Sequence, residues 1–289
     1  MTNPATRTAY GPMLLAAIEN SYPEGRGLTR DHLAASLLPP HLRALAWACK
    51  SDWLRDRFIA LLERQHPGGW AGIACRKRYL DEQATAAIAA GLGAVINLGA
   101  GFDTRAYRLP ALSNIPVFEV DLPENSAAKR AWLVKTFGAV PPHVTLVPID
   151  FDRQDVGAAL AAQGLDPGIP ALVLWEGVTQ YLTAAGVHRT LDSLARLPAS
   201  SRLVFTYVRQ DFLDGTDLHG FADFNRHPVR KLWHFGLHPD RVAEFLQAHG
   251  WREREQLGPP EMQSRYVRPT GRPLQVMAIE RLVLAEKFQ

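Results

Sequence analysis

A short apolar run that ends in a glycine turn constrains the fold of this chain more than any other feature. Residues 95–105 read VINLGAGFDTR, and a second apolar run, VFEVD at residues 117–121, ends in an acid. This layout is typical of a strand, a loop that opens a helix, and a second strand. In such a unit the glycines let the backbone approach a ligand, and the acid accepts hydrogen bonds from ribose hydroxyls. The pattern therefore predicts a Rossmann-like unit that binds a cofactor containing adenosine.

Composition argues against a nucleic-acid-binding protein. The chain has 289 residues, of which 47% are hydrophobic, and a formal net charge of +3. This is enough apolar material for a full core and too little charge for a basic interaction surface, so we expect no nucleic-acid partner. The densest basic cluster is Arg76-Lys77-Arg78, and three charges on a helix are ordinarily a solvated face.

Cysteine use and hydropathy predict a cytoplasmic protein with no membrane partner. The two cysteines, Cys49 and Cys75, are too few for a disulfide framework or a metal cluster, so we expect reduced thiols and no metal. The chain starts without the pattern of a signal peptide. Residues 83–102 are uncharged over about the length of a membrane span. They are mostly Ala and Gly, however, and split into the end of a helix and a strand.

The first 90 residues are predicted to form a helical cap or lid that contributes to the cofactor and acceptor sites. Apolar residues there recur at spacings of three and four, and the breaks between the helical segments carry Pro and Gly. The predicted helices cover residues 13–20, 30–38, 41–50, 53–65 and 76–90.

Residues 91–289 are predicted to form a doubly wound α/β domain, because strand-like runs now alternate with helical ones. The predicted strands are 94–98, 116–120, 144–149, 171–176, 201–208, 251–257 and 274–284, and the helices are 103–108, 123–137, 154–162, 184–196 and 239–250. Between the last two strands we expect a polar loop that contains Arg265 and Tyr266. Ending the sheet on a strand, a loop and a strand resembles the seven-stranded methyltransferase sheet with its terminal antiparallel hairpin.

A glycine turn follows the first of four successive strands, and three acids and an aromatic residue follow the next three, at the edge where open α/β sheets bind ligands. An acidic rim suits hydroxyls, amines and positive charge, and it repels pyrophosphate, which favours S-adenosylmethionine over NAD. Thr104 also replaces the third glycine of the dinucleotide motif. The rim residues are Gly99 and Gly101, then Asp121, then Asp150 and Phe151, and finally Glu176.

Simpler interpretations of these residues exist. A Gly-x-Gly is often only a tight turn, and Asp121 or Asp150 would equally serve as the N-cap of a following helix. Glu176 is harder to explain in this way, because it directly follows the buried-strand pattern ALVLW. A nicotinamide-dependent oxidoreductase and a non-catalytic cofactor-binding protein remain as alternatives.

Several motifs together resemble the leucine carboxyl methyltransferase family, in particular its small bacterial members. They are Arg76-x-Arg78-x-x-Asp81, NLGAGFDTR at 97–105, EVDLP at 119–123, IDF at 149–151 and WEGVTQYL at 175–182. The resemblance extends from Thr8 to about Gly250. It implies a class I S-adenosylmethionine-dependent methyltransferase of the branch that methylates oxygen in small molecules.

The resemblance also implies roles for the rim. Arg76 would bind the cofactor carboxylate, Gly99 would contact its methionine part, and Asp121 would bind its ribose. Asp150 and Phe151 would contact the adenine, and Glu176 the amino group or the ribose side.

The acceptor group decides whether a base is required. A carboxyl with a pKa near 4 is about 99.9% ionised at neutral pH, whereas a phenol near 10 is only about 0.1% ionised. Positioning alone therefore serves a carboxylate, while a hydroxyl needs a base such as histidine.

Positioning and acceptor-binding candidates lie near the ends of later strands and in later loops, although Tyr181 would equally be a packed aromatic. Four histidines before the last helix have spacings that fit no metal motif, and one of them acting as a base would favour a hydroxyl acceptor. The positioning candidates are Tyr181 and Tyr207, the acceptor candidates are Arg209, Arg265 and Tyr266, and the histidines are His219, His227, His234 and His238.

Overall fold

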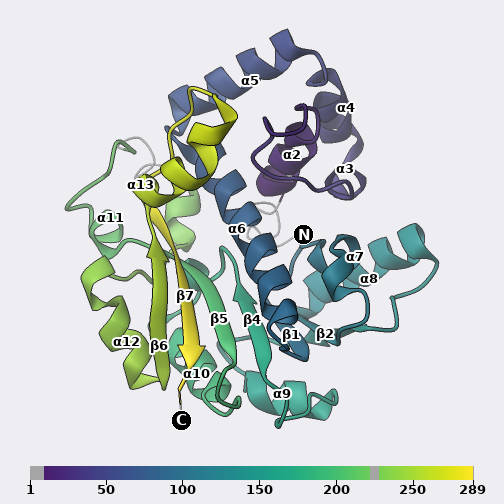
Figure 1. The fold of residues 1–289 in the computed structure, drawn as a ribbon, viewed down its shortest axis with the longest axis vertical. Coiled ribbons are helices and arrows are strands. Elements are labelled where there is room, and N and C mark those ends of the chain that lie inside the picture. Colours follow the sequence, from purple (N-terminus) through teal and green to yellow (C-terminus); the bar gives the residue numbers. More distant parts are fainter. Residues whose placement is uncertain (1–9, 222–227, 289) are drawn as a thin grey trace.

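The computed structural model describes residues 10–221 and 228–288 as an α/β protein built on one seven-stranded sheet (Figure 1). The strand order is β3-β2-β1-β4-β5-β7-β6, with β7 antiparallel to both of its neighbours and β1 to β5 parallel. This confirms the predicted doubly wound seven-stranded fold. The strands are β1 Ala94–Leu98, β2 Val117–Asp121, β3 Val144–Pro148, β4 Ala171–Trp175, β5 Arg202–Val208, β6 Trp251–Leu257 and β7 Glu280–Lys287.

The central strands are buried along their whole length, as expected when helices cover both faces of a parallel sheet. Every residue of β1, β2 and β4 is buried. Successive side chains enter opposite layers: Val95 belongs to one apolar cluster, and Ala94 and Ile96 belong to the other. The direction of strand progression reverses between β1 and β4, and a ligand crevice is expected outside the strand ends at such a point.

Helices cover both faces of the sheet, and the N-terminal helices α2 to α5, which we call the cap helices, lie beyond one end of it. Figure 1 shows α2 to α5 gathered at the upper end of α6, beyond the end of the sheet toward which β6 points. The helices are α2 Tyr10–Glu19, α3 Ala34–Leu37, α4 Pro40–Ala48, α5 Asp52–Gln65, α6 Gly69–Ala89, α7 Arg105–Arg108, α8 Pro123–Phe137, α9 Val156–Ala162, α10 Ala184–Leu194, α11 Gln210–Asp214, α12 Val242–Ala248 and α13 Pro259–Met262.

Helix α6 starts seven residues earlier than the predicted boundary at Arg76. Gly68 adopts a left-handed conformation and is the N-cap of α6, so the Gly-Gly pair opens the helix. The earlier start places Trp70 and Ile73 on the same helix as Arg76, and all three line the same cavity. The predicted helix 30–38 is also reduced, to the single turn of α3.

Two predictions for the C-terminal part are wrong. The strand predicted at 274–284 begins only at Glu280, because the preceding residues leave the sheet and Met277 N donates to the carbonyl of Gly68. The polar loop predicted around Arg265 is instead helical: α13 continues as a π-helix over Gln263–Val267 and a 3₁₀ turn over Arg268–Thr270.

No helix among the described residues is long and apolar enough to cross a membrane. Cys49 and Cys75 are both buried free thiols, and burial raises the pKa of Cys75 to about 12.

Candidate functional site

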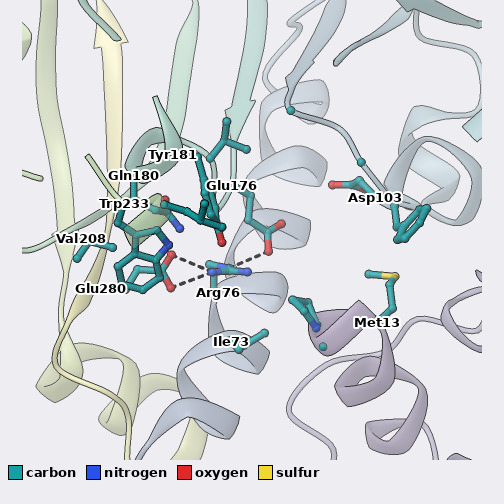
Figure 2. A pocket seen from close by; sticks show the side chains of 18 of the residues that line it. Met13, Ile73, Arg76, Asp103, Glu176, Gln180, Tyr181, Val208, Trp233 and Glu280 are labelled. Atoms are coloured by element: carbon teal, nitrogen blue, oxygen red, sulfur yellow. Dashed lines mark hydrogen bonds and ion pairs between the residues drawn. The ribbon is translucent and has the colours of Figure 1, made fainter. Parts of the chain in front are cut away.

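A cavity of about 970 Å³ lies at the carboxyl ends of the parallel strands, between the sheet and the cap helices. Its size is at the upper end for small-molecule sites and leaves room for a cofactor and a second molecule. The seven residues predicted to bind the cofactor all line this cavity: Arg76, Gly99, Gly101, Asp121, Asp150, Phe151 and Glu176. Figure 2 shows Arg76 and Glu176 facing each other near the middle of the site.

The turn after β1 requires glycine for two separate reasons. Gly99 and Gly101 have φ angles of +66° and +39°, which residues with side chains rarely adopt. A Cβ atom on Gly99 would lie 2.3 Å from Cγ2 of Val178. The amide of Gly101 donates to Oδ2 of Asp121 at 2.6 Å, and Lys129 Nζ donates to the Gly101 carbonyl. The turn is therefore held open as a backbone cradle.

Neither aspartate of the rim is the N-cap of the helix that follows it. The N-cap of α8 is Leu122 and that of α9 is Asp155, whose carboxylate accepts from the amide of Ala158. Asp121 also accepts from Leu122 N and Asn125 Nδ2, both at 2.7 Å, and burial raises its pKa. Asp121 and Asp150 instead line the cavity.

Arg76 joins the end of β4 to the start of β7. Its Nε donates to Glu176 at 2.9 Å, and its Nη1 donates to both carboxylate oxygens of Glu280 at 2.8 and 2.9 Å (Figure 2). Among the described residues its Nη2 forms no hydrogen bond, so that donor stays available to a ligand. Burial by itself would lower the pKa of Arg76, but the charges of Glu280 and Glu176 raise it.

Glu176 is also paired with a second arginine, Arg105, on the side of the glycine turn. Arg105 Nη1 donates to its other oxygen at 2.7 Å, and Arg105 is also paired with Asp103 and Asp81. Burial would raise the pKa of Glu176, but Arg105 and Arg76 hold it well below its usual range. Glu176 therefore stays ionised and fixed at the switch point.

Lys77 is a cavity residue that sequence reasoning missed. It is only 4% exposed, and it lines the cavity beside Arg76. Among the described residues its ammonium forms no ion pair and no hydrogen bond, while its backbone carbonyl accepts from Arg105 Nη2 at 3.2 Å. Burial lowers its pKa, although the charges of Glu176 and Asp103 oppose the shift. The interpretation of residues 76–78 as a solvated face is wrong for Arg76 and Lys77, because only Arg78 remains substantially exposed.

The part of the cavity toward β5 and β7 is lined mainly by apolar side chains, with a few polar groups between them. Tyr181 lines it as predicted, and His234 does so among the four histidines. Sequence reasoning also missed polar residues there. The missed polar residues are His66, Gln180 and Glu280, and the apolar ones are Leu14, Phe58, Leu62, Trp70, Ile73, Val208, Phe221, Leu232, Trp233, Met277 and Ile279.

Four candidates lie outside the lining that the described residues form. Tyr207 is buried and donates to Oε1 of Gln256 at 2.6 Å, and burial raises its pKa. Arg209 is paired with Asp211 on its own loop.

The other two lie near the partly exposed carboxylates of α6 and β6. Arg265 is paired with Glu255 and Glu82, and the buried Tyr266 donates to Glu82 at 2.7 Å.

His219 and His238 are not among the residues that line the cavity. His219 is paired with Asp211 and Asp217, and His238 precedes a short 3₁₀ turn. His227 lies outside the described residues.

Comparison with known proteins assigns this arrangement to a family. Residues 9–195 match leucine carboxyl methyltransferase, and they include all seven residues predicted to bind the cofactor. The chain belongs to the leucine carboxyl methyltransferase family. The match ends after α10, so Val208, Trp233 and the segment that leads into β7 lie beyond it.

Relatives in mycobacteria agree with this assignment. A Mycobacterium ulcerans (strain Agy99) protein named "Putative S-adenosyl-L-methionine-dependent methyltransferase" is 35% identical over 195 residues, 63% of this chain. The alignment spans 62% of that protein, so the chain covers just under two thirds of its length. A Mycobacterium avium (strain 104) protein with the same name is 32% identical over 85% of this chain and 79% of its own length.

A solved structure has the same fold. The protein from Thermobifida fusca YX, described as "a putative methyltransferase", has a TM-score of 0.57 and 17% identity. The similarity covers 94% of this chain and 97% of that one.

Proposed function

We propose that this chain uses S-adenosylmethionine to methylate an oxygen, most readily a carboxylate, of a small molecule. The observation that carries the proposal is that seven residues from four strand ends and one helix line a single cavity. Residues 1–90 would act as the cap of this cavity, and residues 91–289 as the class I methyltransferase core.

The residues present fit the cofactor. The glycine cradle leaves no room for a Cβ at Gly99, and its acidic neighbours suit hydroxyl and amine donors. Asp121 would bind the ribose hydroxyls, Asp150 and Phe151 the adenine, and Glu176 the amino group. The free Nη2 of Arg76 and the ammonium of Lys77 would bind the carboxylate.

S-adenosylmethionine, when bound, supplies a methyl group that an acceptor oxygen would take by donating a lone pair to the methyl carbon. The electron pair of the broken carbon–sulfur bond would stay on sulfur, so the leaving group is a neutral thioether. The chain contributes binding and orientation, and the cap helices exclude water from the cavity. A carboxylate acceptor is already ionised near pH 7, so no side chain has to remove a proton.

A hydroxyl acceptor is the second candidate, and the position of His234 favours it. This histidine lines the cavity and is held by its backbone amide, which donates to the carbonyl of Gln180 at 2.7 Å. It would accept the hydroxyl proton as the new bond to carbon forms.

Calorimetry and a labelled-methyl assay test the proposal. We expect heat from S-adenosylmethionine and none from NAD, followed by transfer of tritiated methyl to small carboxylic acids. Mild base releases the label as methanol from an ester but leaves an aryl ether intact, which separates the two acceptor classes. Binding of NAD alone would overturn the proposal, and cofactor binding without transfer to acids or phenols would support a non-catalytic binding protein.

A further inference from the structure

Exposed apolar side chains gather on two of the cap helices, α4 and α5. Of the seven large hydrophobic residues that are exposed in the described part of the chain, four lie here: Trp47, Trp53, Leu54 and Leu61. The two tryptophans are 71% and 64% exposed. Tryptophan usually buries most of its surface, so two exposed rings on neighbouring helices indicate a surface that contacts something outside the chain.

On α5 the exposed apolar residues alternate with arginines along one side of the helix. Trp53, Arg57, Leu61 and Arg64 follow one another at spacings of four, four and three, which places them in one row. All four are exposed, and the guanidinium of Arg57 lies 5.1 Å from the ring centre of Trp53. We call these four residues the α5 stripe.

The acids of α5 do not neutralise the stripe, because the folded cap already uses them. Asp52 and Asp56 are both paired with the buried Arg55. The carboxylate of Glu63 accepts from two backbone amides at the start of α6. The two arginines of the stripe, in contrast, form no ion pair and no hydrogen bond with any described residue. The stripe therefore carries uncompensated positive charge.

The opposite side of α5 contributes to the cavity, where Phe58 and Leu62 are part of the lining. Figure 1 shows α5 along the upper edge of the molecule, beyond the end of α6. The stripe is thus on the outward side of a helix at the tip of the cap. Such a convex side suits a broad surface better than the side chains of a partner, which need a groove.

A lipid surface with anionic headgroups fits both the apolar and the charged residues of the stripe. Tryptophan favours the boundary between lipid and water, where its ring contacts apolar groups and its N–H stays hydrated. Helices that lie in this boundary combine Trp and Leu, which enter the lipid, with Lys and Arg, which bind anionic headgroups. A second copy of the chain fits less well, because a symmetric contact would bring the unpaired arginines of two stripes together.

We propose that the α5 stripe, with Trp47 and the exposed Lys50 beside it, docks the cap on an anionic membrane surface. The expectation of no membrane partner concerned spanning segments and signal peptides, and docking of this kind needs neither. In this arrangement α5 separates the lipid from the cavity that its other side lines. The contact requires no cofactor and no acceptor, so its test does not depend on the proposed function.

Vesicle binding tests the docking. The chain is sedimented with vesicles of phosphatidylcholine alone and with vesicles in which part of that lipid is replaced by phosphatidylglycerol. We expect roughly tenfold or tighter binding to the anionic vesicles, since each cation near an anionic surface adds about fivefold. Raising sodium chloride toward about 1 M should remove this preference, because the ions screen the charges.

Two double variants separate the contributions of charge and apolar contact. Arg57→Glu with Arg64→Glu should abolish the preference for anionic vesicles. Trp53→Ser with Leu61→Ser should weaken anionic binding by roughly tenfold or more, because the apolar groups no longer enter the lipid. All four side chains are exposed, so the variants should keep their fold, which circular dichroism checks.

Helix α8 offers a matched control. Arg130 and Val134 are exposed there, one helical turn apart and on a different part of the surface from the stripe. The double variant Arg130→Glu with Val134→Ser makes one charge reversal and one apolar deletion of the same kinds. It should bind both types of vesicle as the wild-type chain does.

Several results would overturn the proposal: no binding, equal binding to neutral and anionic vesicles, stripe variants that bind like wild type, or an equal loss in the α8 control. Sedimentation velocity without lipid covers the other occupant. A wild-type dimer that Trp53→Ser with Leu61→Ser converts to a monomer would show that the stripe contacts a second copy of the chain, and this too would overturn the proposal.

Discussion

A buried lysine that forms no ion pair costs a folded protein free energy, since its charge has lost water and gained little in return. Lys77 is in this position: burial lowers its pKa even though Glu176 and Asp103 lie near enough to oppose the shift. A ligand carboxylate would remove the cost. The proposed contact of Lys77 with the cofactor carboxylate would therefore link the stability of the ligand-free protein to its affinity for the cofactor.

Lys77→Met should stabilise the empty protein and weaken cofactor binding. The folded-state pKa of Lys77 is depressed, so the charged side chain destabilises the fold at neutral pH. The unfolding temperature should rise by roughly 2–4 °C for each 1 kcal/mol recovered. The affinity for S-adenosylmethionine should fall by roughly 10- to 100-fold, as expected for a lost charge-assisted hydrogen bond. Thermal unfolding and calorimetry measure the two effects.

The pH dependence gives a second measurement of the same residue. Wild-type affinity should fall as pH rises through the lowered pKa of Lys77, because the ammonium loses its proton. Lys77→Arg keeps the charge and should lack this alkaline loss, and Arg78→Ala should behave as wild type. Unchanged affinity in Lys77→Met would refute the role.

The glycine turn permits a comparison in which backbone strain and steric contact are separated. Gly138→Ala and Gly99→Ala both place a side chain at positive φ, which costs about 1 kcal/mol. Only at Gly99 does the new Cβ meet Val178, since nothing lies within 4 Å at Gly138. We expect Gly99→Ala to lose more stability in urea unfolding and also to lose cofactor affinity. Equal losses in the two variants would show that the contact with Val178 is unimportant.

Sequence reasoning located the rim residues because each follows a buried strand, and parallel strands bring their carboxyl ends together. The same rule could not find Glu280. This residue starts a strand, but β7 runs antiparallel, so its first residue reaches the edge where its neighbour β5 ends. The sequence did offer one signal for Glu280, which is an acid at the start of the last apolar run. Lys77 was missed because burial of one helical turn depends on the cap above it.

At the scale of elements, a buried carboxylate of α2 joins the cap to two other parts of the chain. Glu19, at the end of α2, accepts from Trp70 Nε1 at 2.6 Å and from Arg272 Nη1 at 2.8 and 3.0 Å. It also accepts from the amide of Leu28. The guanidinium of Arg272 lies 3.8 Å from the ring centre of Tyr22. The cap is thereby joined to α6 and to the segment before β7.

Breaking this connection should destabilise the whole chain. Glu19→Gln leaves the buried guanidinium of Arg272 without its counter-charge, which costs about 3 kcal/mol for a buried pair. Glu24→Gln, at an exposed position of the cap, is the control. Chemical denaturation followed by circular dichroism measures both. A loss within about 0.5 kcal/mol of the control would mean that the charge of Glu19 contributes little and that other contacts hold the cap.

The elements differ in how far the sequence predicts them. Fully buried strands such as β1 and β4 were found within a residue or two, since their apolar runs are short and end at turns. The run at 274–284 keeps its apolar character beyond the sheet, because Met277 and Ile279 line the cavity. The spacing of apolar residues in the sequence indicates that they are buried, but it does not indicate which surface they pack against.

For the whole molecule, charge is concentrated at the topological switch point, where Arg76 of α6 and Arg105 of α7 pair with four acids. The acids are Asp81, Asp103, Glu176 and Glu280. Opposite charges hold the pKa values of Glu176 and Asp103 below their usual ranges, against the effect of burial. A carboxyl whose folded-state pKa is depressed stabilises the fold above its unfolded-state pKa. That contribution is lost as pH falls toward the lower, folded-state value. The ion-pair cluster should therefore make the folding of the entire chain sensitive to acid.

Glu176→Gln tests this at the level of global stability. At pH 7 the variant should unfold with about 3 kcal/mol less free energy than wild type, because Arg76 and Arg105 each lose a charged partner. The difference should shrink as pH falls below the ordinary glutamate pKa of 4.5, where the unfolded wild-type chain takes up a proton that its folded form excludes. Urea denaturation between pH 7 and pH 4 measures the trend, with the exposed Glu244→Gln, whose pair with Arg241 is worth little, as the control. A difference that stays constant across this range would mean that the cluster acts through shape and hydrogen bonds and that its charge contributes nothing to stability.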